Sequence, residues 1–137
     1  VYPDFSQKSP KIALAQPVYD SQKRLRGAIG VDCVLSSVGE FLRRLELGQS
    51  GETFIIEREG TLIASSSDIL PFDLQKLRQL YAKESNNNLI RSTANHLEKT
   101  LGDLAAIERP SQFSFKLNGE RKLVKVTPFF ENFGLDW

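Results

Sequence analysis

Asp32 is the residue whose type and neighbours most clearly suggest chemistry in this sequence. It ends the run Leu25-Arg-Gly-Ala-Ile-Gly-Val-Asp32, whose alternation places it on the same strand face as Ala28 and Gly30. Small side chains beside a carboxylate leave room for a small cation or an amine, which the carboxylate can hold by charge-assisted hydrogen bonds. The alternative is that Asp32 caps the helix that follows or accepts a hydrogen bond from a loop.

Residues that could form a catalytic or metal centre are scarce. His96 is the only histidine and Cys33 the only cysteine, so no second His or Cys stands at metal-ligand spacing. The sequence has no glycine-rich phosphate loop, no Gly-x-Ser-x-Gly elbow and no His-Glu-x-x-His or Cys-x-x-Cys motif. We therefore interpret His96 as a surface or boundary residue and expect no enzyme, metal site or cofactor.

The composition is that of an ordinary globular protein. Of the 137 residues, 40% are hydrophobic and 26% are charged. The net charge of +1 comes without a run of Lys and Arg, so nucleic-acid binding is not expected. No stretch of about 18 apolar residues and no signal peptide is recognisable. The absence of Met and the apolar residues up to Trp137 suggest a piece of a longer protein.

Two strands are predicted to position Asp32. Alternating apolar residues predict strands over 12–18 and 25–34, joined by a polar turn at 20–24. The face of the second strand opposite to Asp32 is predicted to be ordinary core. Its residues are Leu25, Gly27, Ile29, Val31 and Cys33.

The rest of the chain predicts a mixture of helices and hairpins. A capping box, Ser37-x-x-Glu40, predicts the start of an amphipathic helix. A hairpin is expected over 53–65, in which the strand Phe54-Ile-Ile56 lacks alternation and is expected to be covered on both faces. A second hairpin over 112–127 turns at Asn118-Gly119. The segment 72–102 is predicted to be helical, with Leu74, Leu77, Leu80 and Tyr81 marking a first helix and Asn86-Asn-Asn88 capping a second. The expected fold class is α+β.

The order of these elements resembles that of the double Cache sensor domains of bacterial receptors, which contain two PAS-like modules. The segments that carry the resemblance are Gln16-Pro-Val-Tyr-Asp20, Leu25-Arg-Gly-Ala-Ile-Gly-Val-Asp32, Phe41-Leu42, Gly48-Gln-Ser-Gly51, Phe54-Ile-Ile, Gly60-Thr-Leu-Ile-Ala64 and Phe133-Gly-Leu-Asp-Trp137. The resemblance covers nearly the whole chain, and it extends to histidine kinases and adenylate or guanylate cyclases of the cyanobacterial type.

The resemblance implies a domain organisation. Residues 1–34 would be the last strands of a membrane-distal module, and residues 35–49 would form a connecting helix. Residues 50–137 would be a membrane-proximal PAS-like module, an antiparallel sheet with a helical insert whose final strand is cut off. The chain would then belong to the extracytoplasmic (periplasmic) portion of an inner-membrane protein, which reaches the membrane only through helices outside this sequence.

The resemblance also implies a ligand and residues to bind it. Amine-binding members of the family hold the ligand amino group with an aspartate on the last distal strand and an upstream Tyr-x-Asp pair. Asp32 matches the first, and Tyr2 and Asp4 match the pair. Two carboxylates and an aromatic ring suit an ammonium group. The implied ligand is a small molecule, with an amino acid or an amine as the candidates, and the implied parent receptor is a homodimer.

The sequence therefore leaves two functions open. In the first, the chain is a sensor module that binds a small molecule and relays the signal to a cytoplasmic kinase or cyclase. In the second, it is a structural or dimerisation module of such a receptor, with no ligand of its own. The Arg and Trp-Tyr residues with which the family grips a ligand carboxylate lie upstream of the residues present here.

Overall fold

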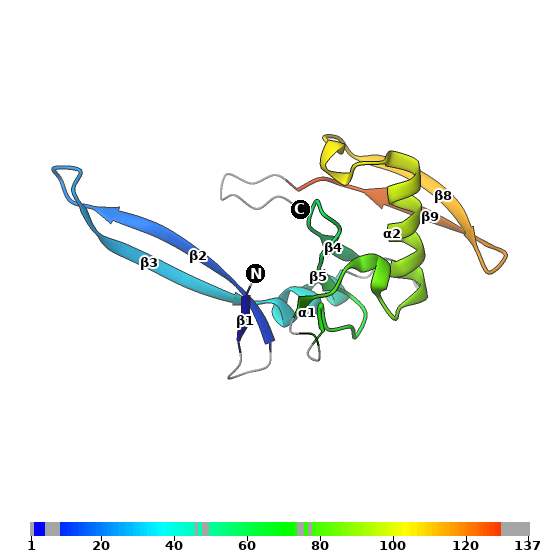
Figure 1. Cartoon of the computed structure of the whole chain (residues 1–137), viewed down its shortest axis with the longest axis horizontal. Helices are drawn as coiled ribbons and strands as arrows, with labels where there is room; N and C mark the ends of the chain where they lie inside the picture. The colour runs from blue at the N-terminus through cyan, green and yellow to red at the C-terminus, as the bar shows by residue number, and fades with distance from the viewer. Residues whose placement is uncertain are drawn as a thin grey trace.

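The chain folds into a long β-ribbon, the arm, and a compact mixed α/β body (Figure 1). The computed structural model describes residues 2–4, 9–45, 47, 50–73, 76 and 78–129. The arm consists of β1 (Tyr2–Asp4), β2 (Ser9–Tyr19) and β3 (Leu25–Val34), which form a three-stranded antiparallel sheet in the order β1-β2-β3. The strand pair and its turn are where the sequence predicts them.

The turn at the tip of the arm is held by Asp20. Its carboxylate accepts hydrogen bonds from the backbone N–H groups of Gln22 and Arg24, each at 2.9 Å. The Arg24 side chain adds an ion pair with Asp20 at 2.9 Å. The backbone bond from Arg24, together with the bonds from its side chain and from Gln22, holds the pKa of Asp20 below its usual value. The polar turn thus sets the register of the long strands on either side of it.

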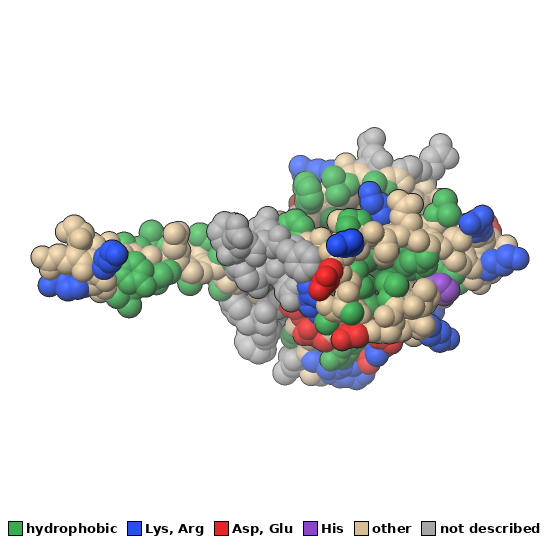
Figure 2. Space-filling model, turned by 90° about the horizontal axis from the view of Figure 1, so that it is seen from above, with side chains coloured by type: hydrophobic (Ala, Val, Ile, Leu, Met, Phe, Trp, Pro, Cys, Tyr) green, Lys and Arg blue, Asp and Glu red, His purple; other side chains and the backbone are tan. Residues whose placement is uncertain are grey.

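The apolar face of β3 is not core, which contradicts the expectation from the sequence. Leu25, Ile29 and Val31 are 64%, 63% and 60% exposed. Figure 1 shows why, because the arm projects away from the body and no described element lies over it. In Figure 2, hydrophobic side chains are visible along the arm outside the body. Strand alternation correctly predicted which side chains share a face. A face is buried, however, only where another helix or sheet covers it.

The helix after the arm, α1 (Leu35–Arg44), starts earlier than the capping box predicts. Its N-cap residue is Val34, which has extended backbone and offers no side-chain hydrogen bond, so the predicted cap at Ser37 is wrong. Leu35, the first helical residue, is 1% exposed and packs in a cluster with Leu42 and Ile63. Burial of this leucine, rather than capping, decides where the helix begins.

The predicted first hairpin is present and forms the middle of the body. It consists of β4 (Phe54–Ile56) and β5 (Leu62–Ser65), and every residue of β5 is buried. Ile63 packs toward α1, whereas Leu62 packs toward α2 (Asn88–Leu101) in a second cluster. β5 lies between two helical layers and has no free face, whereas β4, the strand predicted to be covered on both faces, is only partly buried.

The predicted helix over residues 72–81 is not formed. The chain instead makes the short strands β6 (Phe72–Asp73) and β7 (Arg78–Gln79), followed by the 3-10 turn η1 (Ala82–Glu84). Leu74 and Leu77 lie outside the described residues. The Leu62 N–H donates to the Leu80 carbonyl at 2.8 Å, and Thr61 forms a β-bridge with Tyr81. Pairing with β5 therefore overrides the local helical pattern in this segment.

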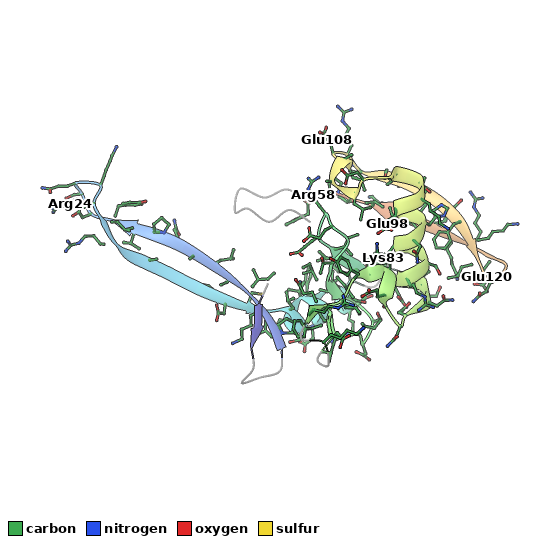
Figure 3. The ribbon with its side chains drawn as sticks, in the orientation of Figure 1. Arg24, Arg58, Lys83, Glu98, Glu108 and Glu120 are labelled. Atoms are coloured by element: carbon green, nitrogen blue, oxygen red, sulfur yellow. The ribbon has the colours of Figure 1, made fainter. Side chains whose placement is uncertain are left out.

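The second predicted helix, α2, is confirmed together with its cap. The Asn87 side chain accepts hydrogen bonds from the N–H groups of Leu89 and Ile90, at 2.8 and 3.2 Å. The helix ends at Gly102, whose φ of 72° is left-handed. Lys83 of η1 pairs with Glu98 of α2 at 3.0 Å, and Figure 3 labels both residues. The cap and this ion pair tie α2 to the segment before it.

The C-terminal hairpin also follows the sequence prediction. It consists of β8 (Ser111–Leu117) and β9 (Glu120–Val126), after a 3-10 turn, η2 (Leu104–Ala106). Asn118 and Gly119 have φ values of 52° and 84°, the left-handed values that a type I′ turn needs. His96 of α2 stacks on Phe113 and Phe115 of β8, with ring centroids 5.2 and 5.0 Å apart. The only histidine is therefore a packing residue between helix and hairpin.

The fold class is α+β, with antiparallel strand pairs and two α-helices among the described residues. In this part of the chain, β4–β5 and β8–β9 form separate two-stranded sheets. The expected entry to a final strand, Phe133–Trp137, lies outside the described residues. Within the ranges given above, no helix has the length and apolar character needed to cross a membrane.

Candidate functional site

Asp32 lies on an exposed shelf of small residues on the arm. Its partner position on β2 is Ala13, and the next two pairs on the same face are Ala15 with Gly30 and Pro17 with Ala28. The Asp32 side chain makes no hydrogen bond or ion pair with another described residue, and Asp32 is exposed. It does not cap α1, whose N-cap bond is absent. Its carboxylate is therefore available to a ligand, and its neighbours leave space beside it.

The backbone register places all three predicted site residues on one face of the arm. Tyr2 is opposite Lys11 and Asp4 is opposite Ser9, while Asp32 is opposite Ala13. Residues directly opposite each other in an antiparallel pair share a face, and Ser9, Lys11 and Ala13 alternate onto the same side of β2. The side chains of Tyr2 and Asp4 lie outside the described residues, so only their register positions are assigned.

The spacing between these positions suits a small ligand. Asp32 and Tyr2 are two strands apart and one alternation step apart along the strands. With strands about 4.8 Å apart and residues about 3.3 Å apart, their Cα atoms are separated by about 12 Å. Asp4 lies one alternation step further away. An amino acid or a short amine can reach across the first gap, since it is comparable to the combined reach of a side chain and a small ligand.

Lys11 is a residue of this face that sequence reasoning did not single out. It occupies the central strand between Tyr2 of β1 and Val34 of β3, diagonal to Asp32. A lysine and an aspartate thus occupy neighbouring positions on this face of the arm. Only the strand pairing reveals this proximity, because the two positions are distant in the sequence.

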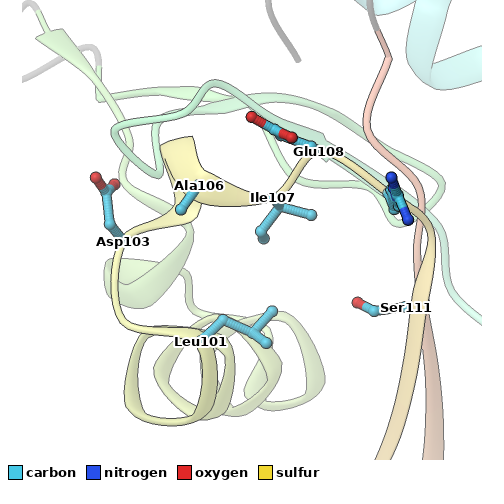
Figure 4. A pocket seen from close by; sticks show the side chains of 7 residues that line it. Leu101, Asp103, Ala106, Ile107, Glu108 and Ser111 are labelled. Atoms are coloured by element: carbon cyan, nitrogen blue, oxygen red, sulfur yellow. The ribbon is translucent and has the colours of Figure 1, made fainter.

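The body contains a separate pocket between the end of α2, η2 and the start of β8 (Figure 4). Its volume is about 350 Å³, and it is lined by Leu101, Asp103, Ala106, Ile107, Glu108, Arg109 and Ser111. The Ser111 hydroxyl oxygen is buried and has no hydrogen-bond partner among the described residues. Nothing in the sequence singled out this pocket, since its lining comes from a turn with no recognisable motif.

The chemistry of this pocket is limited. The Asp103 carboxylate already accepts a hydrogen bond from the Ala105 N–H at 2.9 Å and so caps η2. Glu108 and Arg109 are exposed and carry charges of opposite sign. His96 stacks on two phenylalanines and is not part of the lining. Of the described side chains, no group of three or more His, Cys, Asp or Glu could hold a metal ion. The pocket therefore offers a ligand one hydroxyl group without a partner among the described residues, whereas the arm offers an exposed carboxylate.

Glu57, at the start of the turn between β4 and β5, makes the stability of the folded protein depend on pH. Burial, and secondly the negative charge of Glu59, raises the pKa of Glu57 above its usual value. The folded protein therefore binds this proton more tightly than the unfolded chain, so stability from Glu57 is lost as pH rises through the raised pKa.

We expect Glu57→Gln to be more stable than the unchanged protein at neutral pH, because the glutamine need not ionise in a partly buried site. The difference should disappear below the ordinary carboxyl value of about 4.5, where glutamate is protonated in both states. Urea denaturation at several pH values measures it. A stability difference that grew toward acid pH would contradict the assignment.

No protein-family model matches this sequence, and a comparison with curated proteins finds no match to it.

Proposed function

We propose that this chain is part of an extracytoplasmic sensor domain that binds a small amino acid or amine on the arm. The observation that carries the proposal is the Asp32 carboxylate, exposed and unpaired among the described residues beside a shelf of small side chains. The common face of Tyr2, Asp4 and Asp32 supports it, since these are the positions that the resemblance to Cache domains selects.

The chemistry of the arm suits the ammonium group of an amino acid or of a simple amine. The ligand ammonium would donate hydrogen bonds to the Asp32 carboxylate. It would lie on the face of the arm that also carries the register positions of Tyr2 and Asp4.

The path for a signal follows from the chain order. Asp32 stands three residues before Leu35, which starts α1 and is buried against the body. α1 contacts both β2 of the arm and β5 of the body. A ligand that changes the angle of β3 would move α1 over β5. The proposed body is a PAS-like module that relays this movement toward membrane helices and a cytoplasmic kinase or cyclase outside this chain. No catalytic role is proposed for the chain itself.

The test is a titration of the 137-residue chain with single amino acids and with simple amines of equal size, followed by thermal unfolding. A ligand at 100 times its dissociation constant should stabilise the folded state by about 2.7 kcal/mol. We expect Asp32→Ala to abolish the stabilisation. Glu40→Ala is the control, because it removes another exposed carboxylate that has no ion pair with a described residue, on α1.

A stabilisation that survives Asp32→Ala would place the ligand elsewhere, the 350 Å³ pocket of the body being the next candidate. If no ligand stabilises the protein, the second function, a structural or dimerisation module, is favoured. The exposed apolar face of the arm is the observation that supports that second function.

A further inference from the structure

The outer edge of β3 is an unprotected sheet edge. β3 is the last strand in the order β1-β2-β3, so its outward backbone N–H and C=O groups have no partner strand among the described residues. It is ten residues long and contains no proline, and the register irregularity between β2 and β3 lies at the far end, between Val18 and Tyr19. Natural edge strands are usually short or are interrupted by proline, bulges or several charges. Such an edge can therefore accept another strand.

The charges of β3 are arranged symmetrically. Arg26 and Asp32 are its only charged residues, and Ile29 lies midway between them. They have opposite signs and lie on the same strand face, since their numbers differ by an even number. A strand with this pattern is complementary to a reversed copy of itself, because reversal about Ile29 exchanges the two charges.

We propose that two copies of this chain associate by antiparallel pairing of their β3 edges, centred on Ile29. Arg26 of each copy would lie opposite Asp32 of the second copy, which gives two cross-strand ion pairs. The remaining pairs are Leu25 with Cys33, Gly27 with Val31, and Ala28 with Gly30. The two arms become one continuous sheet with both apolar faces on the same side.

Pairings of the two strands centred one residue to either side of Ile29 do not place Arg26 opposite Asp32. A centre at Ala28 places Arg24 opposite Asp32, but Arg24 already forms an ion pair with Asp20 at 2.9 Å. A centre at Gly30 places Ala28 opposite Asp32 and leaves Arg26 opposite Val34. Opposite charges on facing strands attract and like charges repel, so the register centred on Ile29 is favoured.

The shape of the molecule allows this pairing. The arm projects from the body (Figure 1). The ten residues of β3 span about 33 Å, at about 3.3 Å per residue. Antiparallel pairing places the two bodies at opposite ends of the joined arms. A two-stranded ribbon is marginal in water, whereas a sheet of three or more strands with an apolar face is more stable. The second copy therefore supplies the strands that the tip of the arm lacks.

This inference goes beyond the proposed sensor function, but both use Asp32. A carboxylate has two oxygens, so one can accept from Arg26 of the second copy and the other from a ligand ammonium. The two proposals are distinguished by exchanging the charges. The double variant Arg26→Asp with Asp32→Arg should restore association while leaving no carboxylate at position 32 for an amine.

The first experiment measures the mass of the full 137-residue chain by sedimentation over a range of concentrations. We expect a dimer, and we expect Arg26→Asp and Asp32→Arg each to weaken it about tenfold or more, because each creates two like-charged pairs. The double variant should recover the affinity. Lys125→Asp, on the exposed β9 position, makes the same charge change as Arg26→Asp and should leave the dimer intact. A monomer at all concentrations, or single variants that associate unchanged, would overturn the proposal.

The second experiment tests the register. In a Cys33→Ser background, Ile29→Cys places one thiol directly opposite its own copy and should form a disulfide-linked dimer under mild oxidation. Leu25→Cys in the same background would face position 33, which then carries no thiol, and should not cross-link. Efficient cross-linking at position 25 but not at 29 would overturn the proposed register. Circular dichroism of each variant checks that the body remains folded.

Discussion

Replacing Ile90 with alanine is expected to lower the free energy of unfolding of this protein by about 2–5 kcal/mol. Ile90 stands in the first turn of α2, is 0% exposed, and packs with Leu62, Ala82 and Ala94 in a hydrophobic cluster of the body. Truncation would lose the burial of the side chain and leave a cavity between strand and helix. Denaturation by urea, followed by the helical signal in circular dichroism, measures the loss.

The matched control for this variant is Leu123→Ala on β9. Leu123 is 80% exposed, so its truncation should change the free energy of unfolding by less than about 0.5 kcal/mol. If the two variants lost similar stability, Ile90 would not be a core residue. An unfolding slope that differs between Ile90→Ala and the unchanged protein would instead indicate that α2 detaches from the body separately.

Replacing Gly39 with leucine is expected to cost about 2–3 kcal/mol, through overpacking and displacement of α1. Gly39 is buried in the middle of α1, where the helix crosses β5. A Cβ atom at this position would lie 3.1 Å from the Ser65 carbonyl oxygen, which is backbone and cannot rotate away. A leucine there would have to push helix and strand apart, and the cluster of Leu35, Leu42 and Ile63 would open.

The control for Gly39→Leu is Glu40→Leu, at the adjacent exposed position of α1. It adds a similar side chain to the same helix without approaching β5, so its effect on thermal unfolding should be small. Gly39→Ala should lie between the two, because alanine favours the helix by about 1 kcal/mol over glycine while its Cβ is crowded. Equal effects of Gly39→Leu and Glu40→Leu would show that α1 and β5 are not in close contact.

The close contact at Gly39 also matters for the proposed function. α1 is the element between the arm and the body, and Gly39 allows it to lie directly on β5. If ligand or partner binding on the arm moves α1, that movement reaches the central strand of the body. A variant that holds α1 away from β5 should therefore leave binding on the arm intact and weaken its effect on the stability of the body.

Elements with short-range causes could be predicted from the sequence alone. The arm turn depends on Asp20 and residues within four positions of it, and the C-terminal hairpin depends on the left-handed conformations of Asn118 and Gly119. The start of α2 depends on Asn87 and the N–H groups directly after it. Each of these signals lies within about five consecutive residues, so it can be recognised without knowledge of distant contacts. The α+β class and the face that Asp32 occupies follow from the same local patterns.

Features with long-range causes needed the tertiary structure. The segment before Tyr81 pairs with β5 instead of forming a helix, and α1 starts at Leu35 because that residue is buried against Ile63. The pocket at the end of α2 and the position of Lys11 beside Asp32 likewise depend on which segments meet in space. The exposure of the apolar face of β3 shows the same limit, since alternation identifies such a face but not what covers it. Local sequence determines backbone preference, whereas burial and pairing depend on residues distant in the chain, and their energies are large enough to override that preference.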